Sequence, residues 1–380
     1  EAKSQHPDLD IKVFVDYHRA QRGLIGEKAC LGNRELYLKV NDKKPDSIGF
    51  YGIPVKTKEL FGVLHLKGMV FDDKLLYSGA SINNVYCHQN DKYRLDRYHI
   101  LSSSCLANSF VQFLDSVFVN SNAAFRLDLP SLPTAKQVKI SARAIKRLVR
   151  TNPYRLPLEP KQEGDITVEP FVGFGKRGNE LNKRIQLLIK QSKDKLVVFT
   201  PYFNLPKSLT KELKKALRRG VKVTMVVGDK TANDFYIPPE KPFSTIGIIP
   251  YAYEQMLRTF VKQHQKHIAS GLLNIHLWLD GDNSYHLKGM VSDDGVHLLT
   301  GNNLNPRAWG LDIENGLFIQ DHNQHLTIQW QLELSAILDN TRIVTCADDI
   351  ESTKDYPEKV KRLWRRLHLS QIDRIIKRFL

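Results

Sequence analysis

Two copies of one short motif carry the residues best suited to chemistry. Residues 65–72 read His-Leu-Lys-Gly-Met-Val-Phe-Asp, and residues 286–293 read His-Leu-Lys-Gly-Met-Val-Ser-Asp. A histidine and a lysine two positions apart on an extended strand point to the same side. A neutral imidazole can attack phosphorus to form a phospho-histidine, and an ammonium group neutralises phosphate oxygens. The motifs therefore predict phosphodiester transfer by the side chains of His65, Lys67, His286 and Lys288.

The duplicated motif also divides the chemical roles between two histidines. One acts as the nucleophile and the other as general acid and then general base, so the two imidazoles need different protonation states. This chemistry needs no metal ion, and the sequence shows no set of residues typical of a metal site. Asp72 and Asp293 end the two motifs, where the pattern predicts hairpin turns.

A matching loop follows each motif and extends the repeat. Residues 79–83 read Gly-Ala-Ser-Ile-Asn, and residues 301–305 read Gly-Asn-Asn-Leu-Asn. Two copies of one unit predict two similar halves, packed about a pseudo-twofold axis. In the second half the pattern predicts a buried strand over 195–202, a helix over 208–219 that ends at Gly220, and a further strand over 221–227.

The first half lacks the start of this pattern. Residues 1–5 resemble the end of the helix and residues 11–15 match the second strand. We therefore expect that the sequence begins partway through the first half and that the native protein carries a further N-terminal segment. The chain is expected to divide into a first half (1–125), a proline-rich linker (126–170), a second half (171–345) and a basic C-terminal segment (346–380).

Composition limits the classes to which the protein can belong. The chain has 380 residues, and its 42% hydrophobic content excludes wholesale disorder. Its formal net charge of +15 points to a polyanionic partner, which can be nucleic acid, an anionic membrane or a phosphate-bearing substrate. No apolar run approaches the ~20 residues of a transmembrane helix. The four cysteines form no CxxC pair, which argues against a zinc ribbon or disulfide scaffold and favours a reducing compartment.

The two motifs resemble those of the phospholipase D superfamily. The resemblance is closer to one of its families, the phosphatidylserine synthases of Gram-negative bacteria, and it covers essentially the whole chain. This resemblance implies an α/β fold with two α/β/α halves, each built on a mixed sheet, and an active site in the cleft between them. The segments that carry it are 15–23, 91–94, 200–206, 228–238, 285–290 and 300–309.

The resemblance also implies a reaction. The substrates would be CDP-diacylglycerol and L-serine and the products phosphatidylserine and CMP, formed by a ping-pong route through a phosphatidyl-histidine without a cofactor. His65 is our choice for the nucleophile and His286 for the acid and base, although the reverse assignment fits the pattern as well. The groups expected to hold the phosphate are Lys67, Lys288, Asn83 and Asn305, with Ser81 and Asn303 beside them in the two loops.

In this superfamily a carboxylate downstream of the motif orients the histidine. Glu314 fits this role for the second half. The first half offers no glutamate there, so Asp96 is expected to serve it, with Asp91 as the alternative. Asp72 and Asp293 are expected to brace their hairpins rather than touch substrate.

A polar segment at residues 229–234 can bind serine or cytidine. Its density of charged and amide side chains is the sequence feature that favours a site, and a structural turn is the alternative. The residues assigned to this segment are Asp229, Lys230 and Asn233.

The C-terminal segment, residues 357–380, is strongly basic and amphipathic. Apolar residues recur at helical spacing, and eight basic residues crowd the remainder. This pattern is typical of a helix lying on anionic lipid, and the alternative is a helix that packs its apolar stripe on the protein. A second basic helix is predicted over 135–151, with Ile140, Ala144 and Leu148 on one face and Val149 at its edge. The residues assigned to membrane contact are Lys361, Arg362, Trp364, Arg365 and Arg366.

These features place the protein in the cytoplasm, peripheral on the inner membrane, with ribosomes or other polyanions as incidental partners and no specific nucleic acid. The main alternative is another phosphodiester enzyme of the same superfamily, either a cardiolipin synthase, a phospholipase D or a nuclease. A non-catalytic lipid- or nucleic-acid-binding protein is a second alternative, against which two intact motifs argue.

Overall fold

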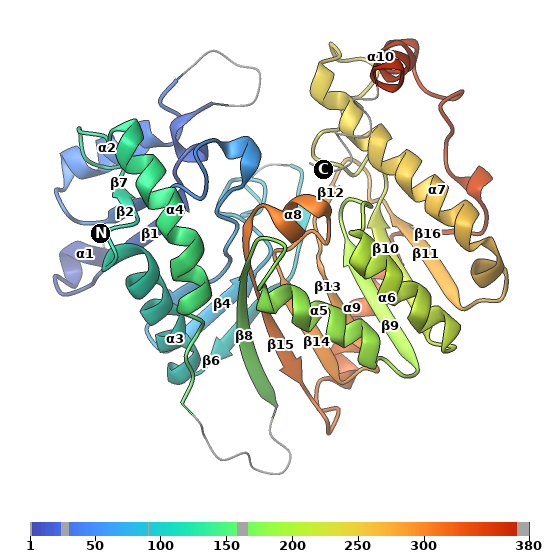
Figure 1. Ribbon diagram of the computed structural model, residues 1–380, viewed down its shortest axis with the longest axis horizontal. Helices are drawn as coiled ribbons and strands as arrows, with labels where there is room; N and C mark the ends of the chain where they lie inside the picture. Colours follow the sequence, from blue (N-terminus) through green and yellow to red (C-terminus); the bar gives the residue numbers. More distant parts are fainter. Residues whose placement is uncertain (1, 24–29, 90, 158–165, 371–379) are drawn as a thin grey trace.

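The protein consists of two α/β halves that lie side by side (Figure 1). The computed structural model describes residues 2–23, 30–89, 91–157, 166–370 and 380. Both halves carry mixed sheets covered by helices, so the expected fold class is confirmed. The last described strand of the first half is β7 (Phe125–Arg126), and β8 (Thr167–Phe174) joins the sheet of the second half.

An eight-stranded mixed sheet forms the second half, in the order β16-β11-β10-β9-β13-β14-β15-β8. Strands β9, β10 and β11 run parallel, whereas the neighbouring pairs on either side are antiparallel. The apolar runs predicted to be strands are buried on both faces, as parallel strands between helices must be. These strands span Lys195–Thr200 (β9), Lys222–Gly228 (β10), Leu273–Trp278 (β11), Gly289–Ser292 (β13), Val296–Thr300 (β14), Ile313–Gln320 (β15) and Thr341–Val344 (β16).

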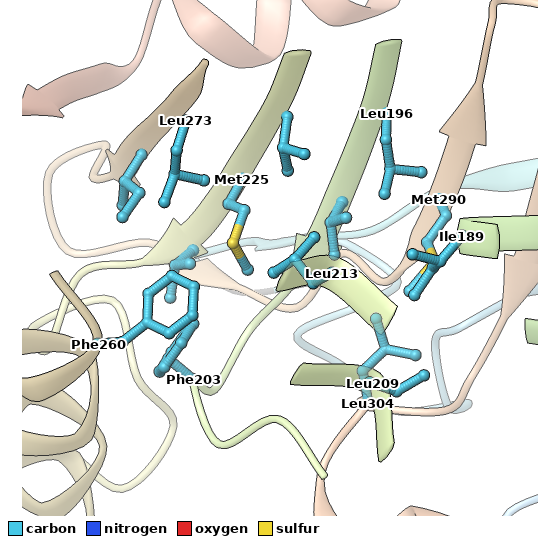
Figure 2. Close-up of a cluster of buried hydrophobic side chains, with 14 of the residues drawn as sticks. Ile189, Leu196, Phe203, Leu209, Leu213, Met225, Phe260, Leu273, Met290 and Leu304 are labelled. Atoms are coloured by element: carbon cyan, nitrogen blue, oxygen red, sulfur yellow. The ribbon is translucent and has the colours of Figure 1, made fainter. Parts of the chain in front are cut away.

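Side-chain alternation along the strands supplies a core on each face of this sheet. Leu196 and Val198 of β9 face α5 (Glu180–Gln191), α6 (Lys207–Arg218) and α7 (Ile249–Ala269). Figure 2 shows this core, in which Met225, Leu213 and Phe260 meet between sheet and helices. Val197 and Phe199 face the opposite way, toward α9 (Thr327–Leu338). The two-residue period of the strand therefore makes one strand serve two cores.

The first half repeats this order in two separate three-stranded sheets, β1-β2-β7 and β3-β4-β6. They correspond to β10-β11-β16 and β13-β14-β15, and the described residues supply no counterpart of β9 between them. The consequence is visible at one repeated position, because Ile82 is 76% exposed whereas Leu304 is fully buried beneath α6. These strands span Lys12–Asp16 (β1), Gly49–Ile53 (β2), Met69–Phe71 (β3), Lys74–Ser78 (β4) and Tyr98–Ser102 (β6).

Backbone pairing ties the two halves together at two equivalent places. The amide of His65 donates to the carbonyl of Ile313 at 3.0 Å, directly before Glu314. The amide of His286 donates to the carbonyl of Leu95 at 3.0 Å, directly before Asp96. A parallel pair of short strands, β5 (Arg94–Leu95) and β12 (Ser284–Tyr285), extends the second contact. The backbone pairing therefore places His65 beside Glu314 and His286 beside Asp96, each in the other half.

The basic helix predicted over 135–151 is present as α4 (Ala135–Thr151), but the face predicted for it is only partly buried. Ile140 is 57% exposed, whereas Leu148 packs on the core beside the buried Ile145 and Val149, and Val138 is buried one turn or more before them. Steps of four and seven residues place Val138, Ile145 and Val149 on one helical stripe, which the first half and β8 cover. The six basic side chains of the helix are exposed.

The C-terminal helix α10 (Glu358–Leu369) lies at the outer edge of the second half (Figure 1). Val360 is buried against Tyr251 and Tyr356, and Trp364 is half-buried, so the start of its apolar stripe packs on the protein. Arg362, Arg365 and Arg366 are exposed. The part of the predicted amphipathic segment over 371–379 lies outside the described residues.

The remaining elements are short or lie at the edges of the halves. Within the part of the chain that the structure describes, no helix combines the length and apolar character needed to cross a bilayer. The other helices are α1 (Ala2–Gln5), η1 (Arg19–Gln21), α2 (Arg34–Lys43), η2 (Glu59–Phe61), α3 (Ser104–Leu114), η3 (Asp115–Val119), η4 (Thr245–Ile248), α8 (Pro306–Gly310) and η5 (Ala347–Asp349).

Candidate active site

The two motifs meet at the junction of the halves. His65 and Lys67 precede β3, and His286 and Lys288 precede β13, each pair in an extended segment. Burial lowers the pKa of His65 well below its ordinary value, and the charges of Lys67 and Lys288 lower it further. The structure therefore brings all four side chains to one place, as the repeat predicts.

Glu314 holds the imidazole of His65. Both carboxyl oxygens of Glu314 lie 2.9 Å from Nδ1 of His65, and Glu314 is almost wholly buried. The expectation that Glu314 orients the histidine of its own half is therefore wrong. The side chain on β15 reaches the first-half histidine because the His65 amide pairs with the residue before Glu314.

Asp96 holds the imidazole of His286 in the same crosswise way. Oδ2 of Asp96 lies 2.9 Å from Nδ1 of His286. Asp91, the alternative considered for this role, is exposed. The hydroxyl of Tyr86 also contacts Nδ1 of His286, and Nζ of Lys288 lies 2.9 Å from Nε2. The carboxylate contacts at Nδ1 leave Nε2 as the reactive nitrogen of His65, whereas Nε2 of His286 lies beside the ammonium of Lys288.

Both imidazoles are neutral at neutral pH. Burial and the positive charge of Lys288 lower the pKa of His286 to about 4, against the opposing effect of Asp96. The pKa of His65 is also lowered, as described above. A neutral imidazole has the lone pair that a nucleophile or a general base requires.

The two carboxyl groups are electrostatically unequal. Burial opposes ionisation of Asp96, but Lys288 and the hydrogen bond with His286 outweigh it and lower the pKa of Asp96. Burial and the neighbouring Asp312 raise the pKa of Glu314 well above its ordinary value. A positive charge on the paired imidazole is therefore better stabilised at His286 than at His65.

The lysines differ in their surroundings. Burial lowers the pKa of Lys288 to about 8, although Asp96 partly restores it. Nζ of Lys67 lies 3.2 Å from the hydroxyl of Ser81. A Cβ on Gly301 would come within 2.6 Å of the Lys67 side chain, so the glycine of the second loop makes room for the first lysine. Gly79 makes room for Asp96 in the same way, because a Cβ there would lie 2.8 Å from a carboxyl oxygen.

The asparagines of the two loops hold backbone turns. Oδ1 of Asn83 accepts from the amide of Tyr86 at 3.1 Å, and Oδ1 of Asn305 caps α8 by accepting from Ala308 at 2.9 Å. Their side-chain oxygens thus have structural partners, and the contact with phosphate expected of both residues stays a prediction. Asn303 presents a buried Oδ1 that has no hydrogen-bond partner among the described residues.

The motif aspartates lie in the hairpin turns, with Asp72 at φ 52° and Asp293 at φ 50°. The carboxylate of Asp293 accepts from three consecutive amides at the start of β9, at 2.9–3.0 Å. Asp293 therefore braces its hairpin against the neighbouring strand. Asp72 is exposed in the equivalent turn of the first half.

The segment that begins at Asp229 lines a small cavity of about 20 Å³ beside the carboxyl ends of β9 and β10. Lys230 is paired there with Glu254 at 3.3 Å, and burial raises the pKa of Glu254 to about 7. Asp229 lies 3.2 Å from Arg342, and Oδ1 of Asn233 accepts from the amide of Phe235 at 2.9 Å. All three residues assigned to this segment therefore have protein partners.

Several side chains at the site escaped the sequence analysis. Asn315 fixes the backbone of Lys67 through two hydrogen bonds at 2.9 and 2.8 Å, and Asp16 accepts from the amide before His65 at 2.9 Å. Tyr86 contacts His286, as described above. None of them lies within a motif, and their positions depend on contacts between distant segments. Among the described residues no cluster of three or more histidine, cysteine or acidic side chains forms a metal site.

The chain is similar to characterised lipid enzymes over its whole length. Residues 185–337 match the family model described as cardiolipin synthase, PLD-like domain. The CDP-diacylglycerol–serine O-phosphatidyltransferases of Haemophilus influenzae and Escherichia coli are each 44% identical to it, over all of this chain and 84% of the relative. The crystal structure of phosphatidylserine synthase from Haemophilus influenzae superposes with a TM-score of 0.94, covering 100% of this chain and 85% of that one.

Identity at this level over the full chain, together with two intact motifs and the shared fold, shows the family. The chain belongs to the phosphatidylserine synthase family of the phospholipase D superfamily.

Proposed function

We propose that the protein transfers the phosphatidyl group of CDP-diacylglycerol to L-serine through a phosphatidyl-histidine. The observation that carries this proposal is the pair of neutral imidazoles, His65 and His286, each held at Nδ1 by a carboxyl group of the other half. The names of relatives that are 44% identical over the whole chain support the two substrates.

In the first step Nε2 of His65 attacks the phosphorus next to diacylglycerol. A nitrogen–phosphorus bond forms, and the bond from phosphorus to the bridging oxygen of the diphosphate breaks. CMP leaves with that oxygen as part of its phosphate, whose last ionisation lies near pH 6, so its departure needs little protonation. Lys67 and Lys288 balance the negative charge that gathers on the phosphate oxygens.

In the second step the hydroxyl of serine attacks the phosphatidyl-histidine. His286 takes the hydroxyl proton at Nε2 while the oxygen–phosphorus bond forms and the nitrogen–phosphorus bond to His65 breaks. Asp96, whose pKa is lowered by Lys288 and His286 despite its burial, stabilises the resulting imidazolium. The inequality of the two carboxyl groups thus supports His65 as the nucleophile and His286 as the base.

We also place the enzyme on the cytoplasmic face of the inner membrane, because the diacylglycerol part of the substrate stays in the bilayer. Exposed arginines on α10 and exposed basic side chains on α4 support contact with anionic lipid. Ribosomes and other polyanions would compete for the same surfaces.

Incubation with CDP-diacylglycerol, with and without L-serine, tests the reaction. We expect serine-dependent release of CMP, formation of phosphatidylserine, and exchange of labelled CMP into CDP-diacylglycerol when serine is absent. Absence of CMP release would reject the proposed function. Release that does not depend on serine would favour a hydrolase of the same superfamily.

A further inference from the structure

An ion pair that the two-step mechanism leaves unused lies beside His286. Nη2 of Arg94, on β5 of the first half, lies 2.9 Å from Oδ1 of Asp234, in the loop after β10 of the second half. Arg94 and Asp96 are two residues apart in an extended segment, so their side chains point to the same side. Tyr93 and Leu95 point the other way and pack on the core. Arg94 therefore shares its direction with the carboxylate that holds His286.

Two tyrosines connect this pair to the catalytic imidazole. The guanidinium of Arg94 lies 5.0 Å from the ring centre of Tyr86, whose hydroxyl contacts His286. The hydroxyl of Tyr202 donates to Oδ2 of Asp234 at 2.9 Å, and its ring stands edge-on to that of His286 with centres 6.5 Å apart. The ion pair is thus one side chain away from the proposed base.

One donor of the pair, Nε of Arg94, has no hydrogen-bond partner among the described residues. This nitrogen is buried, and both oxygens of Asp234 are engaged, Oδ1 by Arg94 and Oδ2 by Tyr202. Buried polar groups are nearly always partnered, and those that are not often await a ligand or an ordered water. The side chains are 20% and 17% exposed, so a small molecule can approach them.

We propose that Arg94 and Asp234 recognise the carboxylate and the ammonium of the acceptor amino acid. The carboxylate binds along the free Nε edge of the guanidinium, whose planar fork matches a carboxylate. The ammonium donates to the carboxylate of Asp234, whose oxygens can each accept a further hydrogen bond. Each charge of the zwitterion then faces an opposite charge, and its hydroxyl is directed toward His286. This assignment rests on the proposed function and adds the site that selects serine.

A salt bridge that only joins the two halves is the alternative explanation. The chain offers a matched control for it in Lys92 and Asp282, which also pair across the halves, at 2.6 Å. They lie near the same strands but are 58% and 82% exposed. Removing their charges breaks a contact between the halves without touching the proposed acceptor site.

The test separates the two half-reactions in the R94Q, D234N, K92Q and D282N variants. We expect R94Q and D234N to raise the KM for L-serine about 10- to 100-fold, since each removes a charge-assisted hydrogen bond. Exchange of CMP into CDP-diacylglycerol should stay within about twofold of wild type, because it does not involve serine. The conservative R94K variant should recover part of the loss. K92Q and D282N should leave both measurements unchanged.

Acceptor analogues sharpen the test. Ethanolamine lacks the carboxylate, so R94Q should reduce the preference for serine over ethanolamine, whereas D234N should weaken use of both. Exchange and serine transfer falling together, with an unchanged KM for serine, would overturn the assignment. So would thermal unfolding curves in which L-serine stabilises D234N as much as wild type. Failure of the wild-type protein to release CMP would instead reject the proposed function.

Discussion

Glu314 lies 2.9 Å from Nδ1 of His65 although the two residues are 249 positions apart and belong to different halves of the repeat. Asp96 and His286 repeat the relationship across 190 positions. Neither half therefore contains a complete histidine–carboxylate pair, and the site exists only where the halves pack. The backbone hydrogen bond from each histidine to the residue before the opposite carboxyl group fixes this exchange.

The crosswise pairing predicts which half-reaction each carboxyl variant slows most. Because Glu314 holds the proposed nucleophile, E314Q should lower CMP exchange about a hundredfold or more. D96N removes the charge that stabilises the imidazolium of His286, so it should slow serine transfer more than exchange. Rate constants for both half-reactions check this, with thermal unfolding as the control for folding. If instead D96N mainly slowed exchange and E314Q mainly slowed serine transfer, each carboxyl group would serve the histidine of its own half.

The histidine variants test the division of roles. H65A should abolish CMP exchange and serine transfer alike, because no phosphatidyl-histidine forms. H286A should slow serine transfer by about 10²–10⁴-fold while sparing much of the exchange, because CMP departs with little protonation. Trapping labelled phosphatidyl-enzyme in H286A and not in H65A would support the assignment. Equal loss of both half-reactions in H286A would contradict the assignment of His286 as the base.

Activity should persist far into the acid range and should be lost earlier on the alkaline side. His286 must be neutral, and its pKa of about 4 means that the active form is lost only as pH falls through that value. Lys288 must be charged, and its pKa of about 8 means that the active form is lost as pH rises through that value. Measuring kcat/KM for L-serine between about pH 4 and about pH 9 checks both limbs. An acid limb near the ordinary value of histidine would contradict the burial of His286.

The exposed arginines of α10 should carry part of the membrane affinity. The triple variant R362Q/R365Q/R366Q should bind vesicles containing phosphatidylglycerol about a hundredfold more weakly at low salt, at about 1 kcal/mol per cation. The matched control removes three exposed cations from α6, as K211Q/K214Q/R218Q. Vesicle sedimentation over a range of salt concentrations measures the effect. Equal weakening in both triples would show that net charge, rather than α10, drives binding.

The repeat in the sequence predicted much of this architecture because identical short motifs fold alike. It indicated two similar halves, the strand of β9, the helix of α6 and the four reactive side chains. Periodicity also located α4, but only part of its buried face, since both stripes of that helix carry apolar residues. The helix pattern alone does not say which stripe a neighbouring sheet covers.

The sequence by itself determined which residues carry the chemistry, because His65, Lys67, His286 and Lys288 stand out by type, spacing and duplication. Only the tertiary structure decided which carboxyl group serves which histidine. Spacing along a chain reports neighbours on one strand or helix, whereas Glu314 reaches His65 through packing between halves. The same packing brings Arg94 and Asp234 together beside His286, and burial then makes the imidazoles neutral and the two carboxyl groups unequal.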